Sequence, residues 1–221
     1  HYKGGCLLIE NFGWAMTMLG YSARPPDRTL VGNKWLQVWQ ERLTRQPLHL
    51  STWLRHQHRD DYWKHGSICE DYGAIKAAVL SIGGWHDGYR NTISHLVEML
   101  EAPVKGIVGP WIHKYPHIAG PAPAIGFLQE AMRWWDRWLR GKATGVEQDP
   151  AYRAYLMDSL NPKRWHPIRP GRWIAEAEWP AARISAHILH FAVNGSLSDA
   201  PVRIDAKICS PQDCGAQSGE Y

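Results

Sequence analysis

The chain has 221 residues, of which 44% are hydrophobic, and its formal net charge is +4. This length and composition allow a buried core of one or two domains and argue against a disordered or fibrous chain. Basic residues are scattered among acidic ones rather than gathered into a stripe, so we expect no nucleic-acid partner.

Membrane and export signals are not evident in the sequence. No stretch approaches the ~20 uninterrupted apolar residues that a membrane helix needs, and the segment His1 to Gly5 has no signal-peptide pattern. We therefore expect no membrane partner and favour a cytoplasmic location. Because the sequence does not start with Met, the compartment of the protein stays open.

The first part of the chain, from about Leu7 to Ile68, has the pattern of a helical segment. Apolar residues recur on one helical face, and prolines interrupt the pattern. The apolar residues are Leu30, Trp35, Val38, Trp39 and Leu43, and the prolines are Pro25, Pro26 and Pro47. We expect residues 1–70 to form a helical cap.

Two short apolar runs follow, Ala74 to Ile82 and Val104 to Val108, and glycine follows each of them. Such runs are typical of strands in a parallel sheet, in which both faces are covered. Between them, residues 89–100 have an apolar helical stripe, which completes a strand, helix, strand unit. A longer helix is expected from about Ala124 to Leu139. We predict that residues 71–180 form the C-terminal part of an α/β core.

The end of the chain has a different pattern, in which apolar and polar residues alternate. This alternation occupies residues 184–189 and 202–208, and Asn194-Gly195 between them is a turn signal. We predict that residues 181–221 form the first strands of a β-sandwich. Two or three strands are too few for a self-sufficient sheet, so we expect the chain to stop inside this domain.

Two side chains that follow the predicted strands are the main functional candidates. Functional residues of open α/β sheets gather at the carboxyl ends of the strands. Asp87 follows the first run and His113 follows the second, which is the order of the acid and the base in α/β-hydrolases. An imidazole can activate a serine hydroxyl, and a carboxylate on its other nitrogen orients the ring. Spacing alone leaves turn and structural roles open for both residues.

Three ordered motifs add a specific resemblance. They are GGWHDGY at Gly83 to Tyr89, GPWIH at Gly109 to His113, and RWWDRWLRG at Arg133 to Gly141. Together they resemble the CocE/NonD hydrolases, the family of cocaine esterase and X-Pro dipeptidyl-peptidases. The resemblance covers nearly the whole chain and implies an α/β fold: an α/β-hydrolase core segment with a helical cap and the start of a C-terminal jelly-roll. It also implies that Asp87 is the triad acid, that His113 is the triad base, and that Tyr89 lies against the bound acyl group.

The nucleophile is missing from this pattern. The Gly-x-Ser-x-Gly motif does not occur, because Ser22 and Ser196 lack the flanking glycines that it requires. In the resembling family the serine, and a tyrosine that helps to form the oxyanion hole, precede the cap. The resemblance therefore implies an internal fragment, truncated at both ends and inactive alone. The complete enzyme would cleave an ester or amide bond through an acyl-enzyme, an X-Pro dipeptidyl-peptidase-like activity included, without a cofactor or metal.

A cluster of imidazoles and carboxylates in the cap region offers an alternative, a metal site. Its members are His56, His58, Asp60, Asp61 and His65. Their spacing matches no metalloprotease helix motif, and the four cysteines form no close pair of the zinc-binding kind. We therefore expect solvated or capping roles for these side chains and no metal.

The rival functional hypothesis is a non-catalytic, Trp-rich binding or interaction module, since the chain has 13 Trp. The hydrolase hypothesis requires Asp87 and His113 to lie within hydrogen-bond reach beside an open cavity, whereas the module requires neither. The expected partner is a small-molecule ester or peptide-like substrate. A homo-oligomer or a complementing N-terminal chain stays open, and an exposed apolar sheet edge would favour the latter.

Overall fold

The computed structural model describes residues 2–3 and 6–205. The chain divides into two compact units, His1–Asp71 and Tyr72–Tyr221, each of which is described by itself. Within the described ranges, no helix has both the length and the apolar character that crossing a bilayer requires.

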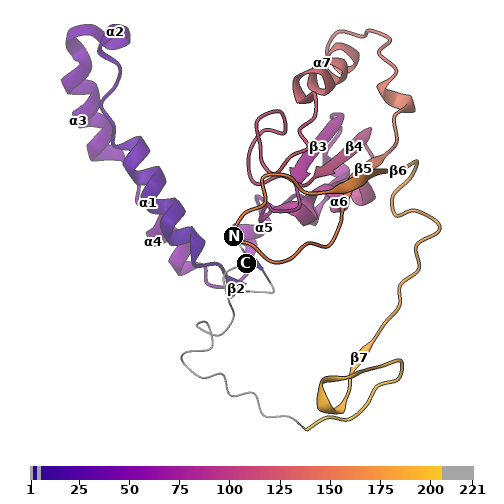
Figure 1. The fold of residues 1–221 in the computed structure, drawn as a ribbon. Coiled ribbons are helices and arrows are strands. Elements are labelled where there is room, and N and C mark those ends of the chain that lie inside the picture. Colours follow the sequence, from indigo (N-terminus) through magenta and orange to yellow (C-terminus); the bar gives the residue numbers. More distant parts are fainter. Residues whose placement is uncertain (1, 4–5, 206–221) are drawn as a thin grey trace. The chain divides into compact units, whose positions relative to one another are not determined.

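The first unit is helical, as the sequence predicts (Figure 1). Its elements are β1 (Tyr2–Lys3), β2 (Cys6–Leu7), α1 (Glu10–Ser22), α2 (Arg28–Val31), η1 (Gly32–Lys34), α3 (Trp35–Arg45), α4 (His49–Arg55), α5 (Asp61–Lys64) and η2 (Ile68–Glu70). Pro25 and Pro26 separate α1 from α2, and Pro47 separates α3 from α4, because proline lacks the N–H that a helix interior needs. The indole Nε1 of Trp39 donates a hydrogen bond to the carbonyl of Ala23 at 2.7 Å, which ties α3 to the end of α1.

The second unit is built on a mixed sheet of order β3-β4-β5-β6. Its elements are η3 (Tyr72–Ala74), β3 (Val79–Gly84), α6 (Arg90–Met99), β4 (Val104–Gly109), α7 (Phe127–Trp138), η4 (Val146–Gln148), β5 (Tyr152–Met157) and β6 (Gly171–Glu176). β3, β4 and β5 are parallel, and β6 is antiparallel to β5. The predicted strand, helix, strand unit is confirmed as β3, α6 and β4, although β3 begins at Val79 rather than at Ala74.

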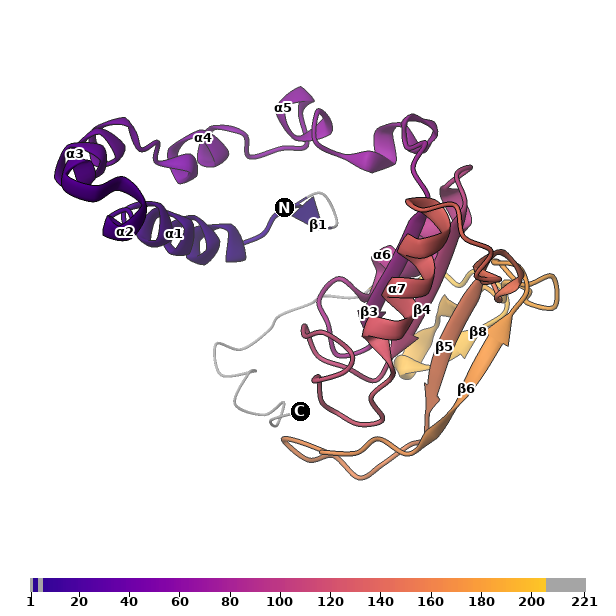
Figure 2. The same ribbon diagram turned by 90° about the horizontal axis from the view of Figure 1, so that it is seen from above.

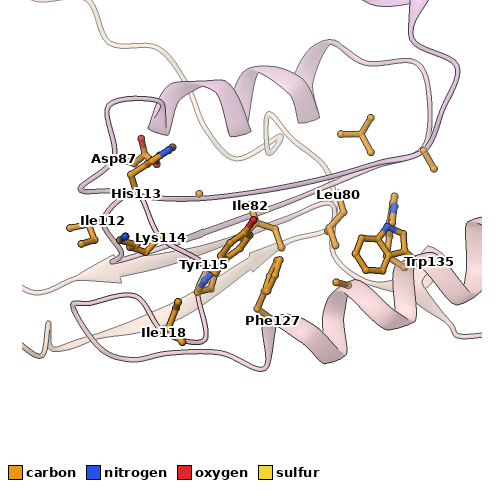
Figure 3. Close-up of a pocket in the computed structure, with 16 residues that line it drawn as sticks. Leu80, Ile82, Asp87, Ile112, His113, Lys114, Tyr115, Ile118, Phe127 and Trp135 are labelled. Carbon is orange, nitrogen blue, oxygen red and sulfur yellow. The ribbon is translucent and has the colours of Figure 1, made fainter. Parts of the chain in front are cut away.

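Helices cover both faces of this sheet, with α6 on one side and α7 on the other (Figures 2 and 3). Successive residues of β4 point to opposite faces, as the strand period requires. Val108 packs with Ile93 and Val97 of α6, whereas Ile107 packs with Trp111 in a separate cluster. Both β4 residues are at most 1% exposed, which explains why the second half of this strand is apolar.

The strands β5 and β6 are not predicted by the sequence analysis. Both contain charged residues, and an alternating or continuous apolar pattern is missing from their sequences, YRAYLM and GRWIAE. In β5 the charge is accommodated by pairing: the guanidinium of Arg153 donates to both carboxylate oxygens of Glu130 on α7, at 3.0 and 3.1 Å. β6 is an edge strand, so its outward side chains remain in water.

The predicted strands near the end of the chain are only partly present. A hairpin forms from β7 (His190–Phe191) and β8 (Leu197–Ser198), and its turn, η5 (Val193–Gly195), ends on Gly195 with a φ of 72°. Residues 184–189 and 202–205 form no strand, so the expectation is wrong there, and residues 206–208 lie outside the described ranges. An alternating segment needs a neighbouring strand for its backbone hydrogen bonds. The β-sandwich itself stays a prediction.

Candidate active site

The two candidate loops leave the sheet side by side. The ladder pairs Gly84 of β3 with Gly109 of β4, so both strands end at the same level. Hydrogen bonds then hold the loops together: Trp85 N–H donates to the Gly109 carbonyl at 2.9 Å, and His86 N–H donates to the Trp111 carbonyl at 3.1 Å. The sheet register therefore brings side chains that are 26 positions apart in the sequence to one edge.

A glycine at position 84 is needed for this close approach. A Cβ on Gly84 would lie 1.9 Å from the Trp111 carbonyl oxygen, which is far inside van der Waals contact. The Trp111 side chain is itself 1% exposed, and its indole Nε1 donates to the Pro123 carbonyl at 2.8 Å. The backbone and the side chain of Trp111 are thus both fixed by contacts. His113 lies two residues after Trp111 on the same loop.

Asp87 and His113 form a hydrogen-bonded pair. The His113 Nδ1 lies 2.7 Å from the Asp87 Oδ2, and the other carboxylate oxygen, Oδ1, accepts the Tyr89 backbone N–H at 2.9 Å. The Asp87 side chain is 10% exposed and that of His113 is 78% exposed. A carboxylate can only accept, so in the neutral ring the proton lies on Nδ1 and the His113 Nε2 keeps its lone pair for another partner. A neutral imidazole in this tautomer can act as a general base.

The Tyr89 ring lies beside His113, with ring centroids 5.6 Å apart and planes inclined by 58°. The ring is largely exposed, while the backbone of the same residue orients Asp87. The structure thus brings together all three predicted site residues, Asp87, Tyr89 and His113.

A cavity of about 1020 Å³ begins at this pair. Figure 3 shows Asp87 and His113 at one end and Trp135 at the other. Between them the walls are apolar, formed by Leu80 and Ile82 of β3 and by Phe127 of α7. The cavity thus lies between β3 and α7, and β3 is the edge strand of the sheet, with no neighbouring strand on its outer side in the described ranges.

Two further polar residues at this edge are not singled out by the sequence analysis. The His86 Nδ1 lies 2.6 Å from the Pro110 carbonyl oxygen, which adds a side-chain link between the two loops. Lys114 lines the cavity directly after His113. Their adjacency to Asp87 and His113 is a signal in the sequence, but the role of each depends on contacts that only the fold creates.

The residues of the alternative metal cluster do not converge. Within the described ranges, no group of three or more His, Cys, Asp or Glu side chains could hold a metal ion. The His56 Nδ1 instead lies 2.6 Å from the Asp60 Oδ2, and the His56 ring stacks on Tyr62. Asp60 caps α5 by accepting the Tyr62 N–H at 3.2 Å. The hydrogen bond from His56 is the main cause of the lowered pKa of Asp60, and the predicted capping role is confirmed.

Comparisons with known proteins identify the family. The sequence profile of the family described as X-Pro dipeptidyl-peptidase (S15 family) matches residues 1–115. Cocaine esterase from Rhodococcus sp. (strain MB1 Bresler) is 25% identical over 136 residues, which cover 57% of this chain and 22% of that protein.

A solved structure shows that the fold is shared. The crystal structure of a CocE/NonD family hydrolase from Staphylococcus aureus has a TM-score of 0.52 and 15% sequence identity to this chain. The match covers 75% of this chain and 29% of that one. The chain therefore spans less than a third of the length of either relative.

Proposed function

The chain belongs to the X-Pro dipeptidyl-peptidase (S15) family and is CocE/NonD-like, and from this premise we propose that it is part of a serine hydrolase that cleaves an ester or amide bond. The observation that carries the proposal is the hydrogen bond of 2.7 Å between His113 and Asp87 at the end of an apolar cavity. The non-catalytic binding module requires neither the pair nor its position, so the geometry favours the enzyme.

The pair performs proton transfer in this proposal. A serine Oγ attacks the carbonyl carbon of the substrate while the His113 Nε2 takes the hydroxyl proton. The tetrahedral intermediate collapses to an acyl-enzyme, and His113 gives the proton to the departing alcohol or amine. A water molecule then attacks the acyl group, His113 takes its proton, and that proton returns to the serine as the acid leaves. Asp87 keeps the ring in the productive tautomer and stabilises the imidazolium.

The low exposure of Asp87 supports its orienting role. A carboxylate that is shielded from water interacts more strongly with an imidazolium than one in bulk solvent. The Tyr89 N–H and the His113 Nδ1 occupy one carboxylate oxygen each, so the carboxylate cannot rotate without losing a hydrogen bond. His113 is exposed on the side where a nucleophile and a substrate have to approach.

The serine lies outside these 221 residues in this proposal, because no Gly-x-Ser-x-Gly motif occurs in them. The edge of β3, which has no neighbouring strand within the described residues, is the site where the complementing polypeptide docks. A further strand parallel to β3 would cover this edge, and its carboxyl end would lie level with the loop that holds Asp87. Tyr89 contacts the acyl group of the substrate, and esters are the first substrates to test because the curated relative is an esterase.

Hydrolysis of p-nitrophenyl esters tests the proposal. In the complete protein, His113→Gln should reduce kcat/KM by at least about a thousandfold, whereas His95→Gln, on the exposed side of α6, should leave it unchanged. The 221-residue chain alone should show no activity above that of free imidazole. Hydrolysis by this chain alone that His113→Ala abolishes would contradict an external serine, and equal activity of His113→Gln and His95→Gln would contradict the role of the pair.

A further inference from the structure

A second cavity, of about 370 Å³, shares no lining residue with the cavity beside Asp87 and His113. It is enclosed by His86, by Pro121 and by the connection between β5 and β6. β5 runs parallel to β4, so this connection begins at the same edge of the sheet as the loop that carries His113. Figure 2 shows it as the orange loop that extends beyond the ends of β5 and β6. None of the residues assigned to catalysis lines this second cavity.

The lining of the second cavity is strongly basic. It contains Lys163, Arg164 and Arg169 together with the imidazoles of His86 and His166, and it contains no carboxylate. Elsewhere in the described ranges, basic side chains such as Arg133, Arg137 and Arg153 do form ion pairs with carboxylates. Lys163, Arg164 and Arg169 form no ion pair within the described residues. Like charges that converge on one cavity without a counter-charge repel one another, and a bound anion relieves this repulsion.

The connection that carries these charges is anchored to the rest of the unit. Ala122 N–H donates to the Pro167 carbonyl at 2.8 Å, and Arg169 N–H donates back to the Ala122 carbonyl at 2.9 Å. The Trp165 ring packs over Gly120, where a Cβ would lie 2.7 Å from the ring. These contacts anchor the C-terminal part of the basic segment, which directly follows the exposed Lys163 and Arg164.

The guanidinium of Arg169 is a second, independent feature of the cavity. Its Nε is buried and lacks a hydrogen-bond partner, and its Nη2 lies 3.5 Å from the Asp158 carbonyl oxygen. A buried donor without a partner costs about 1–3 kcal/mol. This cost and the repulsion among the cations both decrease if an oxyanion binds and draws the guanidinium toward it.

His86 connects this cavity to the catalytic loops. Its Nδ1 is committed to the Pro110 carbonyl, so the Nε2 of the ring is left for the cavity side. When the ring carries a proton on both nitrogens, its Nε2–H can donate to an anion in the cavity while its Nδ1–H holds the loop that leads to His113.

We propose that this basic cavity is a binding site for a small oxyanion, a phosphate or a carboxylate, separate from the cavity beside Asp87 and His113. The ligand is held by the ammonium of Lys163 and the guanidinium groups of Arg164 and Arg169. Its charge-assisted hydrogen bonds, and the contact with His86, brace the loop on which Asp87 lies. The site does not depend on the proposed hydrolysis, because its residues take no part in proton transfer.

Titration of the complete protein with inorganic phosphate, in a phosphate-free buffer of low ionic strength, tests the site. Calorimetry gives the dissociation constant, and the ring nitrogen signals of His86 in a ¹⁵N NMR spectrum report where the anion binds. The variant Lys163→Met/Arg164→Met removes two cavity charges. The control Lys76→Met/Arg203→Met removes the same charge from exposed positions outside the cavity.

We expect saturable phosphate binding that shifts the His86 signals and weakens about tenfold in the cavity variant but less than about twofold in the control. A parallel titration with acetate decides which oxyanion binds more tightly. Equal weakening in the two variants would mean that phosphate responds only to net charge and would overturn the proposal. Lack of saturation, or binding without a change at His86, would overturn it as well. None of these results depends on ester hydrolysis, so they do not bear on the roles of Asp87 and His113.

Discussion

Replacement of Gly84 by alanine tests the physical reason why the acid and base loops meet. The new Cβ would lie 1.9 Å from the Trp111 carbonyl oxygen, and ordinary contact begins at 3.4 Å, so the two strand ends have to separate by about 1.5 Å. The hydrogen bond from His86 N–H to Trp111, now 3.1 Å long, would not survive such a shift. Overpacking costs about 1–3 kcal/mol and each lost hydrogen bond about 1 kcal/mol, so we expect a loss of about 2–4 kcal/mol.

The matched control is Gly88→Ala in the same motif, where an added Cβ meets nothing within 4 Å. We expect this change to alter the free energy of unfolding by less than about 1 kcal/mol. Urea unfolding of the complete protein, followed by tryptophan fluorescence, measures both variants. In Gly84→Ala, the separation of the two strand ends also stretches the Asp87–His113 hydrogen bond. The rate of ester hydrolysis should therefore fall in Gly84→Ala and persist in Gly88→Ala. Equal stability of the two variants would refute the argument that close approach requires glycine at position 84.

Three further predictions concern individual side chains. Asp87→Asn should lower kcat by about 10³–10⁴-fold with little change in KM, because the amide can stabilise the wrong tautomer of His113; steady-state kinetics measures it. Tyr89→Leu should raise KM for aryl esters severalfold and leave the pH profile of kcat unchanged, because its ring is the proposed acyl contact; a substrate series checks this. Hydrogen bonding by Lys142 lowers the pKa of Asp136 in the folded chain. Ionised Asp136 therefore stabilises the fold at pH values above its unfolded pKa near 3.8. This stabilisation is lost as the pH falls through the lower pKa of the folded state. Lys142→Met should therefore raise the pKa of Asp136 toward 3.8, which ¹³C NMR of the carboxyl carbon can follow.

Each of these predictions has a control in the same chain. Asp205→Asn removes an exposed carboxylate and should leave kcat unchanged. Tyr89→Phe keeps the ring and should keep KM. Lys76→Met should not move the pKa of Asp136. A normal kcat in Asp87→Asn would contradict the role of the Asp87–His113 hydrogen bond. A raised KM in Tyr89→Phe would contradict the contact of the Tyr89 ring with the acyl group. An unchanged pKa of Asp136 in Lys142→Met would contradict the Lys142–Asp136 hydrogen bond.

Local sequence patterns determine the part of the fold that holds the candidate site. The runs before Gly84 and Gly109 are mainly apolar because helices cover both faces of this parallel pair of strands, so they identify β3 and β4 from the sequence alone. The apolar stripe in residues 89–100 identifies α6, because one face of that helix packs on the sheet. Once the two strands are known to be parallel, Asp87 and His113 must emerge at one edge, and the order of acid and base follows without the structure.

Only the tertiary structure decides the remaining features, because they depend on partners that are distant in the sequence. β5 carries Arg153 into the sheet, and the compensating Glu130 lies 23 positions away on α7. Residues 184–189 alternate like a strand but have no strand beside them, so the pattern alone does not produce one. The same reason applies to the site: the distance of 2.7 Å between His113 and Asp87 depends on the register of β3 with β4 and on the contact of Gly84 with Trp111. A sequence pattern reports which surface a residue prefers, whereas the identity and distance of its neighbour are set by long-range pairing of the backbone.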